Sequence, residues 1–375
     1  MREHLLTLNA GSSSIKFALF ARDGTLRRPE LAGQVDGIAT RGGPATHAEA
    51  LAAVLQRLGA ARVAAVGHRI VHGGVRFDRP VLIDDVAMAA MTELAPLAPL
   101  HQPHNLAGVH AARLAFAGVP QVACFDTAFH RAMPELNQRF ALPQALFDAG
   151  VRRYGFHGLS YESICTQLRQ ADPAAARGRV VIAHLGNGAS MCALRDGRPV
   201  ATTMSFSPLD GLPMGTRCGR LDAAVVLHLL QHHGKSADDI GRLLYRESGL
   251  LGLSGLSSDM RELEASASPQ AALAIDYFVE HIQRELAGMA AALRGIDTLV
   301  FTGGIGENAA ALRARVVQGA AWMGLALDAR ANQRGAEVIS SAAAAVAVRV
   351  MRTNEEAVIA RHTARCAWGE SGTLA

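Results

Sequence analysis

TLNAGSSSIKFALF, residues 7–20, joins two apolar runs through a short turn of glycine and serine residues. This pattern predicts a β-hairpin rather than a strand–helix–strand unit. A second stretch, HLGNGASMCAL at residues 184–194, repeats the plan about half a chain later. One hairpin in each half predicts a duplicated protein of two domains, with the active site in the cleft between them.

The spacing of apolar residues around these hairpins predicts alternating strands and helices, and therefore an α/β fold in which helices cover central sheets. Thr353 and Glu356 predict a capping box at the start of the last helix. The expected strands are 4–9, 15–20, 63–71, 121–125, 179–185, 189–194, 298–303 and 346–352. The expected helices are 46–58, 103–117, 159–170, 221–232, 268–293, 306–319 and 354–366.

The composition is that of a folded protein with an ample core. Of 375 residues, 50% are hydrophobic and 19% charged, which excludes a disordered chain and suits two or three domains. Five cysteines without a CxxC pair argue against a disulfide scaffold or a structural zinc site. No apolar run approaches the roughly 18 residues of a membrane span, and no secretory signal is recognisable. We therefore expect a cytoplasmic protein without a membrane partner.

The basic residues are almost all arginines. Lys16 and Lys235 are the two lysines among 37 basic residues, and the 35 arginines are scattered without a run longer than a pair. Nucleic-acid binders usually concentrate their charge in a stripe or cluster, so no nucleic-acid partner is expected despite the net charge of +4. Against this background, a lysine in the first hairpin indicates a specific need for a lysine.

Five glycine-rich turns interrupt the chain, at residues 9–14, 72–74, 184–188, 252–259 and 302–308. Small residues allow backbone N–H groups to approach and cradle phosphate, so several such turns indicate a polyphosphate ligand. The chain contains neither a P-loop sequence nor a strand-linked GxGxxG, HExxH or GxSxG motif.

The first hairpin carries groups suited to a nucleotide phosphate chain with Mg²⁺. Asn9, Ser12 and Ser14 supply neutral donors and acceptors, and Lys16 follows at strand spacing. The alternative is a solvated hairpin tip whose lysine extends into water. Asp126 follows an apolar strand, where catalytic groups of α/β proteins often lie, although it could instead cap a turn.

Arg69 and Arg217 lie in glycine-flanked segments, where a planar guanidinium can hold a carboxylate or phosphate with two bonds. A structural salt bridge is the alternative for each. His68 and His72 would share a metal ion only on a helix, whereas their segment is expected to be a strand. Cys218 is expected to be a small core or turn residue, because no partner base is evident.

Ten motifs in order resemble those of the acetate kinase family, from residue 4 to about 362. The resemblance implies two duplicated actin-like ATPase (ribonuclease H-like) domains and a homodimer. It also implies transfer of a phosphoryl group from ATP to acetate, which needs Mg²⁺ or Mn²⁺ and serves acetyl-CoA biosynthesis. Residues 1–149 with 353–375 would form the acyl and metal domain, and residues 150–352 the nucleotide domain. The motifs are LNAGSSSIKF, GHRIVHGG, LAPLHQPHN, FDTAFH, YGFHG, HLGNGAS, MGTRCG, SGLSSDMR, FTGGIGEN and RTNEEAVIA.

The same resemblance assigns roles to individual residues. The implied metal positions are Asn9 and Glu355; the implied catalytic residues are Asp126, His157 and Arg217. The implied acyl-substrate positions are Arg69, Val71, Leu100 and Pro208. The implied nucleotide positions are Lys16, His184, Leu185, Gly186, Asn187, Gly188, Asp259, Met260, Arg261, Gly304, Ile305, Gly306, Glu307 and Asn308. Asp210, where the family usually has Glu, and Pro213 depart from the family pattern.

The implied chemistry needs no general base, because a carboxylate nucleophile is already ionised at neutral pH. We therefore expect Asp126 to act through Mg²⁺ or by orienting arginines, and the transfer to be direct and in-line. A propionate kinase is one alternative, since one methylene changes selectivity by only about 1–3 kcal/mol. A non-catalytic nucleotide switch on the same fold is another, and for Glu355 the first turn of a helix is itself a sufficient reason for a carboxylate.

Overall fold

A computed structural model describes residues 2–11 and 13–369. The chain forms two compact units. Unit 1 comprises Met1–Arg131, Phe156–Thr166 and Asn354–Ala375, and unit 2 comprises Ala132–Gly155 and Gln167–Thr353. Residues 132–155 thus group with unit 2 and residues 156–166 with unit 1, so the chain changes unit more often than a single boundary near residue 149 implies.

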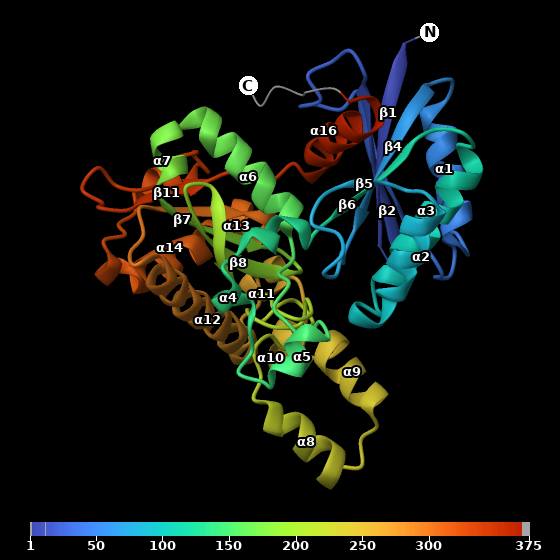
Figure 1. The fold of residues 1–375 in the computed structure, drawn as a ribbon. Coiled ribbons are helices and arrows are strands. Elements are labelled where there is room, and N and C mark those ends of the chain that lie inside the picture. The colour runs from blue at the N-terminus through green and yellow to red at the C-terminus, as the bar shows by residue number, and fades with distance from the viewer. Residues whose placement is uncertain (1, 12, 370–375) are drawn as a thin grey trace. The chain divides into compact units, whose positions relative to one another are not determined.

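The sheet of unit 1 has the strand order β3-β2-β1-β4-β6-β5 (Figure 1). The first hairpin forms its antiparallel pair β1–β2, and β3 extends this pair as an antiparallel meander. β4 and β6 run parallel to β1, so the carboxyl ends of these three strands lie at one edge. The strands are β1 (Glu3–Ala10), β2 (Ser14–Ala21), β3 (Leu31–Asp36), β4 (Arg62–Ile70), β5 (Val81–Leu82) and β6 (Gln121–Phe125).

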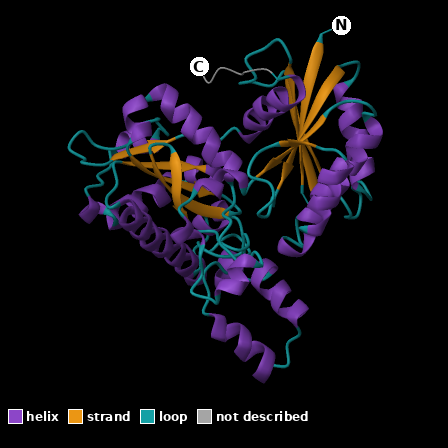
Figure 2. Cartoon of the chain, viewed as in Figure 1, coloured by secondary structure: helices purple, strands orange, loops and turns teal. Residues whose placement is uncertain are grey.

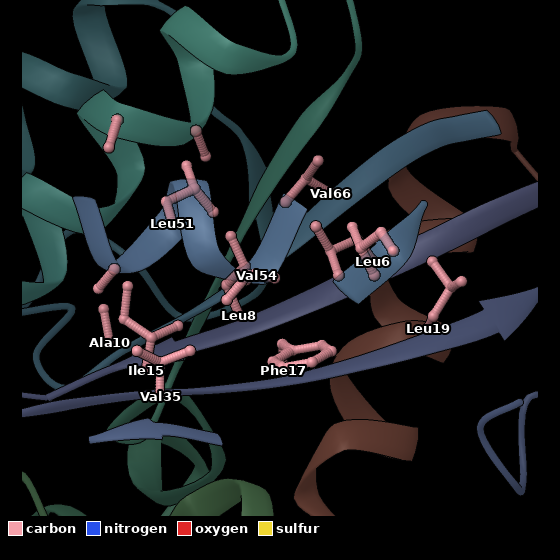
Figure 3. Close-up of a cluster of buried hydrophobic side chains, with 14 of the residues drawn as sticks. Leu6, Leu8, Ala10, Ile15, Phe17, Leu19, Val35, Leu51, Val54 and Val66 are labelled. Carbon is pink, nitrogen blue, oxygen red and sulfur yellow. The ribbon is translucent and has the colours of Figure 1, made fainter. Parts of the chain in front are cut away.

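Side chains of these strands point alternately to the two faces of the sheet and contribute to a hydrophobic core on each face. Leu6, Leu8 and Phe17 belong to one buried cluster with residues of α1 and α3. Figure 3 shows this cluster. Leu5 points to the other face, where α16 packs, because successive strand residues face opposite sides. The helices that cover this sheet are α1 (His47–Leu58), α2 (Asp85–Glu93), α3 (Gln102–Ala115) and α16 (Glu355–Trp368).

The sheet of unit 2 repeats this plan. Its order is β11-β10-β7-β8-β9, with an antiparallel meander β7–β8–β9 and parallel neighbours β10 and β11. The expected duplication and fold class are therefore confirmed, and Figure 2 shows both sheets. The strands are β7 (Arg179–Leu185), β8 (Ala189–Arg195), β9 (Arg198–Thr202), β10 (Thr298–Thr302) and β11 (Ala347–Val350).

The long helix α12 (Pro269–Leu293) packs against β7, β8 and β9 and against α10 and α14. It is the main helical support of the second sheet. The other helices are α4 (Glu135–Gln138), α5 (Gln144–Asp148), α6 (Gly158–Ala171), α7 (Pro173–Arg177), α8 (Ala223–His232), α9 (Ala237–Arg246), α10 (Gly249–Ser254), α11 (Met260–Glu264), α13 (Gly303–Asn308), α14 (Ala310–Gly319) and α15 (Ala329–Gln333).

Two details differ from the expectations. The helix expected over 306–319 is two helices, because Ala309 leaves the helical conformation between α13 and α14. The capping box of Thr353 and Glu356 is wrong: Asn354 is the N-cap of α16, and its side chain accepts from the Ala357 N–H, which an asparagine does well. In the described part of the chain, no helix is long and apolar enough to cross a membrane.

Candidate functional site

Three candidate residues of unit 1 meet at the sheet edge where parallel strands end. Asn9 lies at the end of β1, Arg69 near the end of β4, and Asp126 directly after β6. Functional groups of α/β proteins gather at such an edge because the chain leaves each strand there. Lys16 is the cross-strand partner of Asn9, which brings the hairpin lysine to the same end of the sheet. Ser12 lies outside the described residues.

Arg69 is the centre of this group. Its Nε donates to Asp126 Oδ1 at 3.0 Å and its Nη2 to Asp126 Oδ2 at 2.5 Å, a two-bonded pair. Its Nη1 donates to Asn9 Oδ1 at 3.2 Å, and Glu355 Oε2 lies 3.9 Å from its Nε. These hydrogen bonds engage three of the five N–H groups of a guanidinium. Asp126, with 1% of its side chain exposed, therefore fixes the orientation of Arg69.

The charges in this group are strongly coupled. Burial alone would lower the pKa of Arg69, but the carboxylates of Asp126 and Glu355 outweigh it and the pKa is raised. Burial raises the pKa of Glu355 well above its ordinary value, Asp126 adds to the rise, and Arg69 opposes it. Two carboxylates thus share one arginine, and a further cation beside Glu355 would favour its ionised form.

Asn105 is a positioning residue that the sequence did not single out. Its Oδ1 accepts from the Val71 N–H at 2.9 Å, and its Nδ2 donates to the Ala10 carbonyl at 2.5 Å. It thereby ties the end of β1 to the segment after β4, which carries buried Val71. Leu100 lies just before α3, partly buried. Asn105 lies in the motif LAPLHQPHN. Its position among the apolar residues on the buried face of α3 was the sequence signal that could have identified it.

His157 has a left-handed backbone, with φ of 57°, which is uncommon for a residue with a side chain. The next residue fixes this conformation: the Gly158 N–H donates to the Asp126 carbonyl at 3.0 Å. A Cβ at Gly158 would lie 2.1 Å from that oxygen, so no larger residue fits there. The turn that presents His157 is therefore built against the backbone of Asp126.

In unit 2, a cavity of about 500 Å³ unites eight of the expected nucleotide residues. Backbone around the glycines forms part of it, and a Cβ at Gly304 would meet nothing within 4 Å. Asp259 and Arg261 at its edge form a two-bonded pair, and the Arg261 hydrogen bond lowers the pKa of Asp259 to about 2. The lining residues are Gly186, Asn187, Ser258, Asp259, Met260, Arg261, Glu264, Gly304, Ile305, Asn308 and Ala309.

The remaining expected nucleotide residues do not line this cavity. Leu185 and Gly306 are buried beneath it. Glu307 turns inward: its Oε1 accepts from the Gly303 N–H at 3.0 Å and from the Thr353 N–H at 3.2 Å. Its carboxylate therefore stabilises the glycine turn by accepting a backbone hydrogen bond from it. His184 and Gly188 flank the lining residues in sequence, and Lys16 belongs to unit 1.

Arg313, which the sequence reasoning missed, holds the other end of that turn. Its side chain is 1% exposed, and its Nη1 donates to the Gly306 and Glu307 carbonyls at 2.9 Å each. Its Nε donates to Asn332 Oδ1 at 2.8 Å. A cation at the carboxyl end of the short helix α13 satisfies carbonyls that have no helical partner. Among so many arginines, no sequence signal distinguished it.

Arg217 lies in a turn attached to the same cavity. Its Nη1 donates to the Pro208 carbonyl at 3.0 Å, which brings two expected site residues together. The Gly215 N–H donates to the Asn187 carbonyl at 3.1 Å, so the turn is bonded to a loop that lines this cavity. Burial raises the pKa of Cys218 to about 11, as suits a structural thiol.

A model of the acetokinase family matches residues 4–361. The chain belongs to the acetokinase family. This acetokinase is 53% identical to the acetate kinase of Methylocella silvestris, over 97% of this chain and 98% of that protein. It is 47% identical to the acetate kinase of Nitrobacter hamburgensis, over 96% and 95% of the two chains.

Solved structures agree with this membership. A propionate kinase from Francisella tularensis superposes with a TM-score of 0.91 at 34% identity, covering 96% of this acetokinase and 99% of that chain. The acetate kinase of Porphyromonas gingivalis superposes with a TM-score of 0.87 at 36% identity, covering 97% and 99%. The resemblance expected from the ten motifs is confirmed over nearly the whole chain.

Proposed function

We propose that this acetokinase transfers the terminal phosphoryl group of ATP to acetate, reversibly, giving acetyl phosphate and ADP. The observation that carries the proposal is the Arg69–Asp126 pair beside buried Val71, a charged and apolar combination suited to a small carboxylate. The nucleotide cavity of unit 2 supplies the second half of the reaction. The names of the Methylocella and Nitrobacter relatives support acetate as the acceptor.

Arg69 would bind the acetate through the two N–H groups that are not engaged in its hydrogen bonds to Asp126 and Asn9. Asp126 would not take a proton, since acetate is already ionised. Its two oxygens both accept from Arg69, so its role in this proposal is to hold the guanidinium in place. In the interpretation that Asp126 orients an arginine, that arginine is Arg69.

The chief barrier is the approach of an anion to a polyanionic phosphate. Two like unit charges 4 Å apart repel by about 4 kcal/mol at an effective dielectric of 20. Arg69, Arg217 and His157 would offset this repulsion and stabilise the charge that develops on the transferred group. Direct in-line transfer, without a phosphoenzyme, is the simplest route for these residues.

The oxygen donors beside Arg69 fit a Mg²⁺ ion shared with nucleotide phosphates. Asn9 supplies an amide oxygen and Glu355 a carboxylate. A bound cation would oppose the rise that burial causes in the pKa of Glu355. In the part of the chain that the structure describes, no three His, Cys, Asp or Glu side chains form a metal cage. Mg²⁺ commonly uses one or two protein ligands plus phosphates, so Asn9 and Glu355 would suffice. The ion, or Mn²⁺, would neutralise phosphate charge.

A homodimer is part of the proposal. None of the ten residues of α8 is buried, although this helix is rich in apolar residues (Figure 1). Leu227 and Leu230 are 54% and 40% exposed, and Val225 is 39% exposed. A second copy of the chain would cover such a face. Sedimentation velocity of the wild type and of Leu227→Asp tests this: a dimer that Leu227→Asp weakens is expected, and a monomeric wild type contradicts it.

A hydroxamate assay for acyl phosphate, with ATP, Mg²⁺ and a series of short carboxylic acids, tests the activity. Acetate is expected to give the highest kcat/KM, with propionate within the roughly 10–200-fold that one methylene allows. Arg217→Ala should lower kcat by about 10²-fold or more while the protein stays folded. Wild-type rates of acetyl phosphate formation by Arg217→Ala would sink the assignment of Arg217.

A further inference from the structure

The turn of residues 211–220, which carries Arg217, is closed at its base by a bond from the Arg220 N–H to the Gly211 carbonyl, at 2.9 Å. Gly211 and Gly219 have φ of +96° and +72°. A Cβ at either would lie 2.6–2.8 Å from neighbouring backbone, so both positions require glycine. The path of this turn is therefore narrowly defined, and what holds its base sets the direction of Arg217.

Two groups hold that base. Asp210 accepts from Ser205 Oγ at 2.5 Å and from the Gly211 N–H at 2.8 Å, and Arg153 Nη1 lies 3.6 Å from its Oδ2. On the other strand of the turn, Arg220 Nη1 lies 3.1 Å from Glu285 Oε1. Glu285 belongs to α12, so this ion pair joins the turn to the helix that packs against the second sheet.

Glu285 is unusual for a helix residue. It is 7% exposed, and none of the chemistry proposed above uses it. Burial raises the pKa of its carboxyl group, and Arg220 opposes this rise. A buried carboxylate is costly unless it is paired, so a hydrophobic residue there would stabilise the helix better. Its presence opposite the turn that carries Arg217 points to a role in placing that turn.

We propose that the Arg220–Glu285 ion pair is a positioning device for Arg217. It fixes the turn to α12 and so sets the angle at which the Arg217 guanidinium meets the transferred phosphoryl group. The inference rests on the proposed phosphoryl transfer. Arg220 and Glu285 touch no substrate in this proposal; they act through the turn, together with the bond from Arg217 to the Pro208 carbonyl.

The first test is kinetic. Glu285→Gln and Arg220→Ala should each lower kcat for acetyl phosphate formation by about tenfold to a hundredfold, the effect of a misplaced catalytic group. The KM for ATP should change by a smaller factor than kcat, because neither Arg220 nor Glu285 lines the nucleotide cavity. The double variant should be no slower than the slower single variant, since both changes break one contact. Arg220→Lys should keep most of the activity, because a lysine keeps the positive charge that faces Glu285.

A matched control lies on the same helix. Glu280 forms an exposed pair with Arg284, 2.9 Å between Oε1 and Nε, so Glu280→Gln changes the same charge on α12 away from the turn. It should leave kcat within about twofold, as exposed pairs contribute little. Unchanged kcat in Glu285→Gln and Arg220→Ala would overturn the proposal. Losses that add in the double variant, or that appear as a higher KM for ATP, would overturn it as well.

Hydrogen–deuterium exchange gives a readout independent of activity. Amides of residues 211–220 should exchange faster in Glu285→Gln and Arg220→Ala than in the wild type or Glu280→Gln. If the wild type forms no acyl phosphate, the proposed function fails, while the exchange still decides whether the pair holds the turn. Unaltered exchange at 211–220 in both variants would overturn the inference even in an active enzyme.

Discussion

The proposed acyl half of the site in unit 1 and the proposed nucleotide half in unit 2 differ in the groups that form them. The group around Arg69 consists of charged and amide side chains at the ends of three strands and at the start of a helix. Asn9 and Asp126 accept hydrogen bonds from Arg69, and Glu355 lies 3.9 Å from it. The cavity of unit 2 is lined by Gly186 and Gly304 together with polar, charged and apolar side chains. Glu307 and Arg313 hydrogen-bond the backbone of its glycine turn. Recognition of a small carboxylate depends on exact side-chain geometry, whereas a phosphate chain can be held by backbone N–H groups.

Arg69→Lys should have the largest effect. A lysine keeps the charge but cannot form the two-bonded pair with Asp126 and still reach Asn9. The kcat/KM for acetate should fall by about 10²-fold, the equivalent of about 2.7 kcal/mol. The KM for ATP should change less than twofold, as steady-state kinetics with each substrate varied can show. A lysine variant that uses acetate normally would mean that charge alone matters in this half.

Arg313→Met tests the support beneath the nucleotide cavity. The change leaves the Gly306 and Glu307 carbonyls without their donor, so the free energy of unfolding should fall by about 2–3 kcal/mol. The KM for ATP should rise, and the KM for acetate should not. Urea denaturation and kinetics measure the two effects. Equal changes in both KM values would show that Arg313 has no special link to the nucleotide turn.

Gly303→Ala and Gly304→Ala form a matched pair. Gly303 has φ of +78°, and a Cβ there would lie 2.7 Å from the Leu185 carbonyl oxygen, so its alanine variant should lose about 1–2 kcal/mol of stability. A Cβ at Gly304 meets no protein atom, so Gly304→Ala should keep its Tm. If backbone holds the nucleotide there, its KM for ATP should rise about tenfold. A Gly304→Ala enzyme with normal ATP kinetics would contradict a backbone-lined phosphate site.

Mild acid should lower the stability of unit 1 through His68 and His130. Near neutral pH this is the smallest of the predicted effects. Burial lowers the pKa of each to about 4, from an ordinary value near 6.5. Between pH 6.5 and pH 4 the unfolded chain binds protons that the folded chain does not. The free energy of unfolding therefore decreases as the pH is lowered, by up to about 1.4 kcal/mol per pH unit for each histidine. Above pH 7 neither histidine contributes to the pH dependence of stability.

Urea denaturation at intervals from pH 7.5 to 4.5 measures that slope. His68→Gln, which keeps a polar partner for Gln121, should remove about half of the histidine contribution. A slope unchanged by this substitution would mean that His68 titrates normally in the folded protein. Hydrogen exchange at pH 5 should show unit 1 opening more readily than at pH 7.

The sequence predicted the elements whose apolar spacing is regular, and it predicted the two hairpins. It missed β3 and β9, which are edge strands. β3 contains Gly33 and β9 contains Pro199, and both residue types count against a strand in sequence rules. It placed a capping box at Thr353, whereas the following asparagine has the geometry to cap. Local rules cannot choose between adjacent polar residues when the neighbouring helix packing decides where the first turn begins.

For the site, the glycine-flanked segments selected Arg69 and Arg217 as candidates, the end of an apolar strand selected Asp126, and the family resemblance assigned their roles. Sequence alone left a salt bridge as the alternative for Arg69, and the fold shows why both descriptions hold: Arg69 is paired with Asp126 and keeps N–H groups toward the sheet edge. Asn105, Arg313 and the Arg220–Glu285 pair were decided only by tertiary structure. They make contacts across 95, 19 and 65 residues of sequence, respectively, and no local pattern encodes a contact between distant segments.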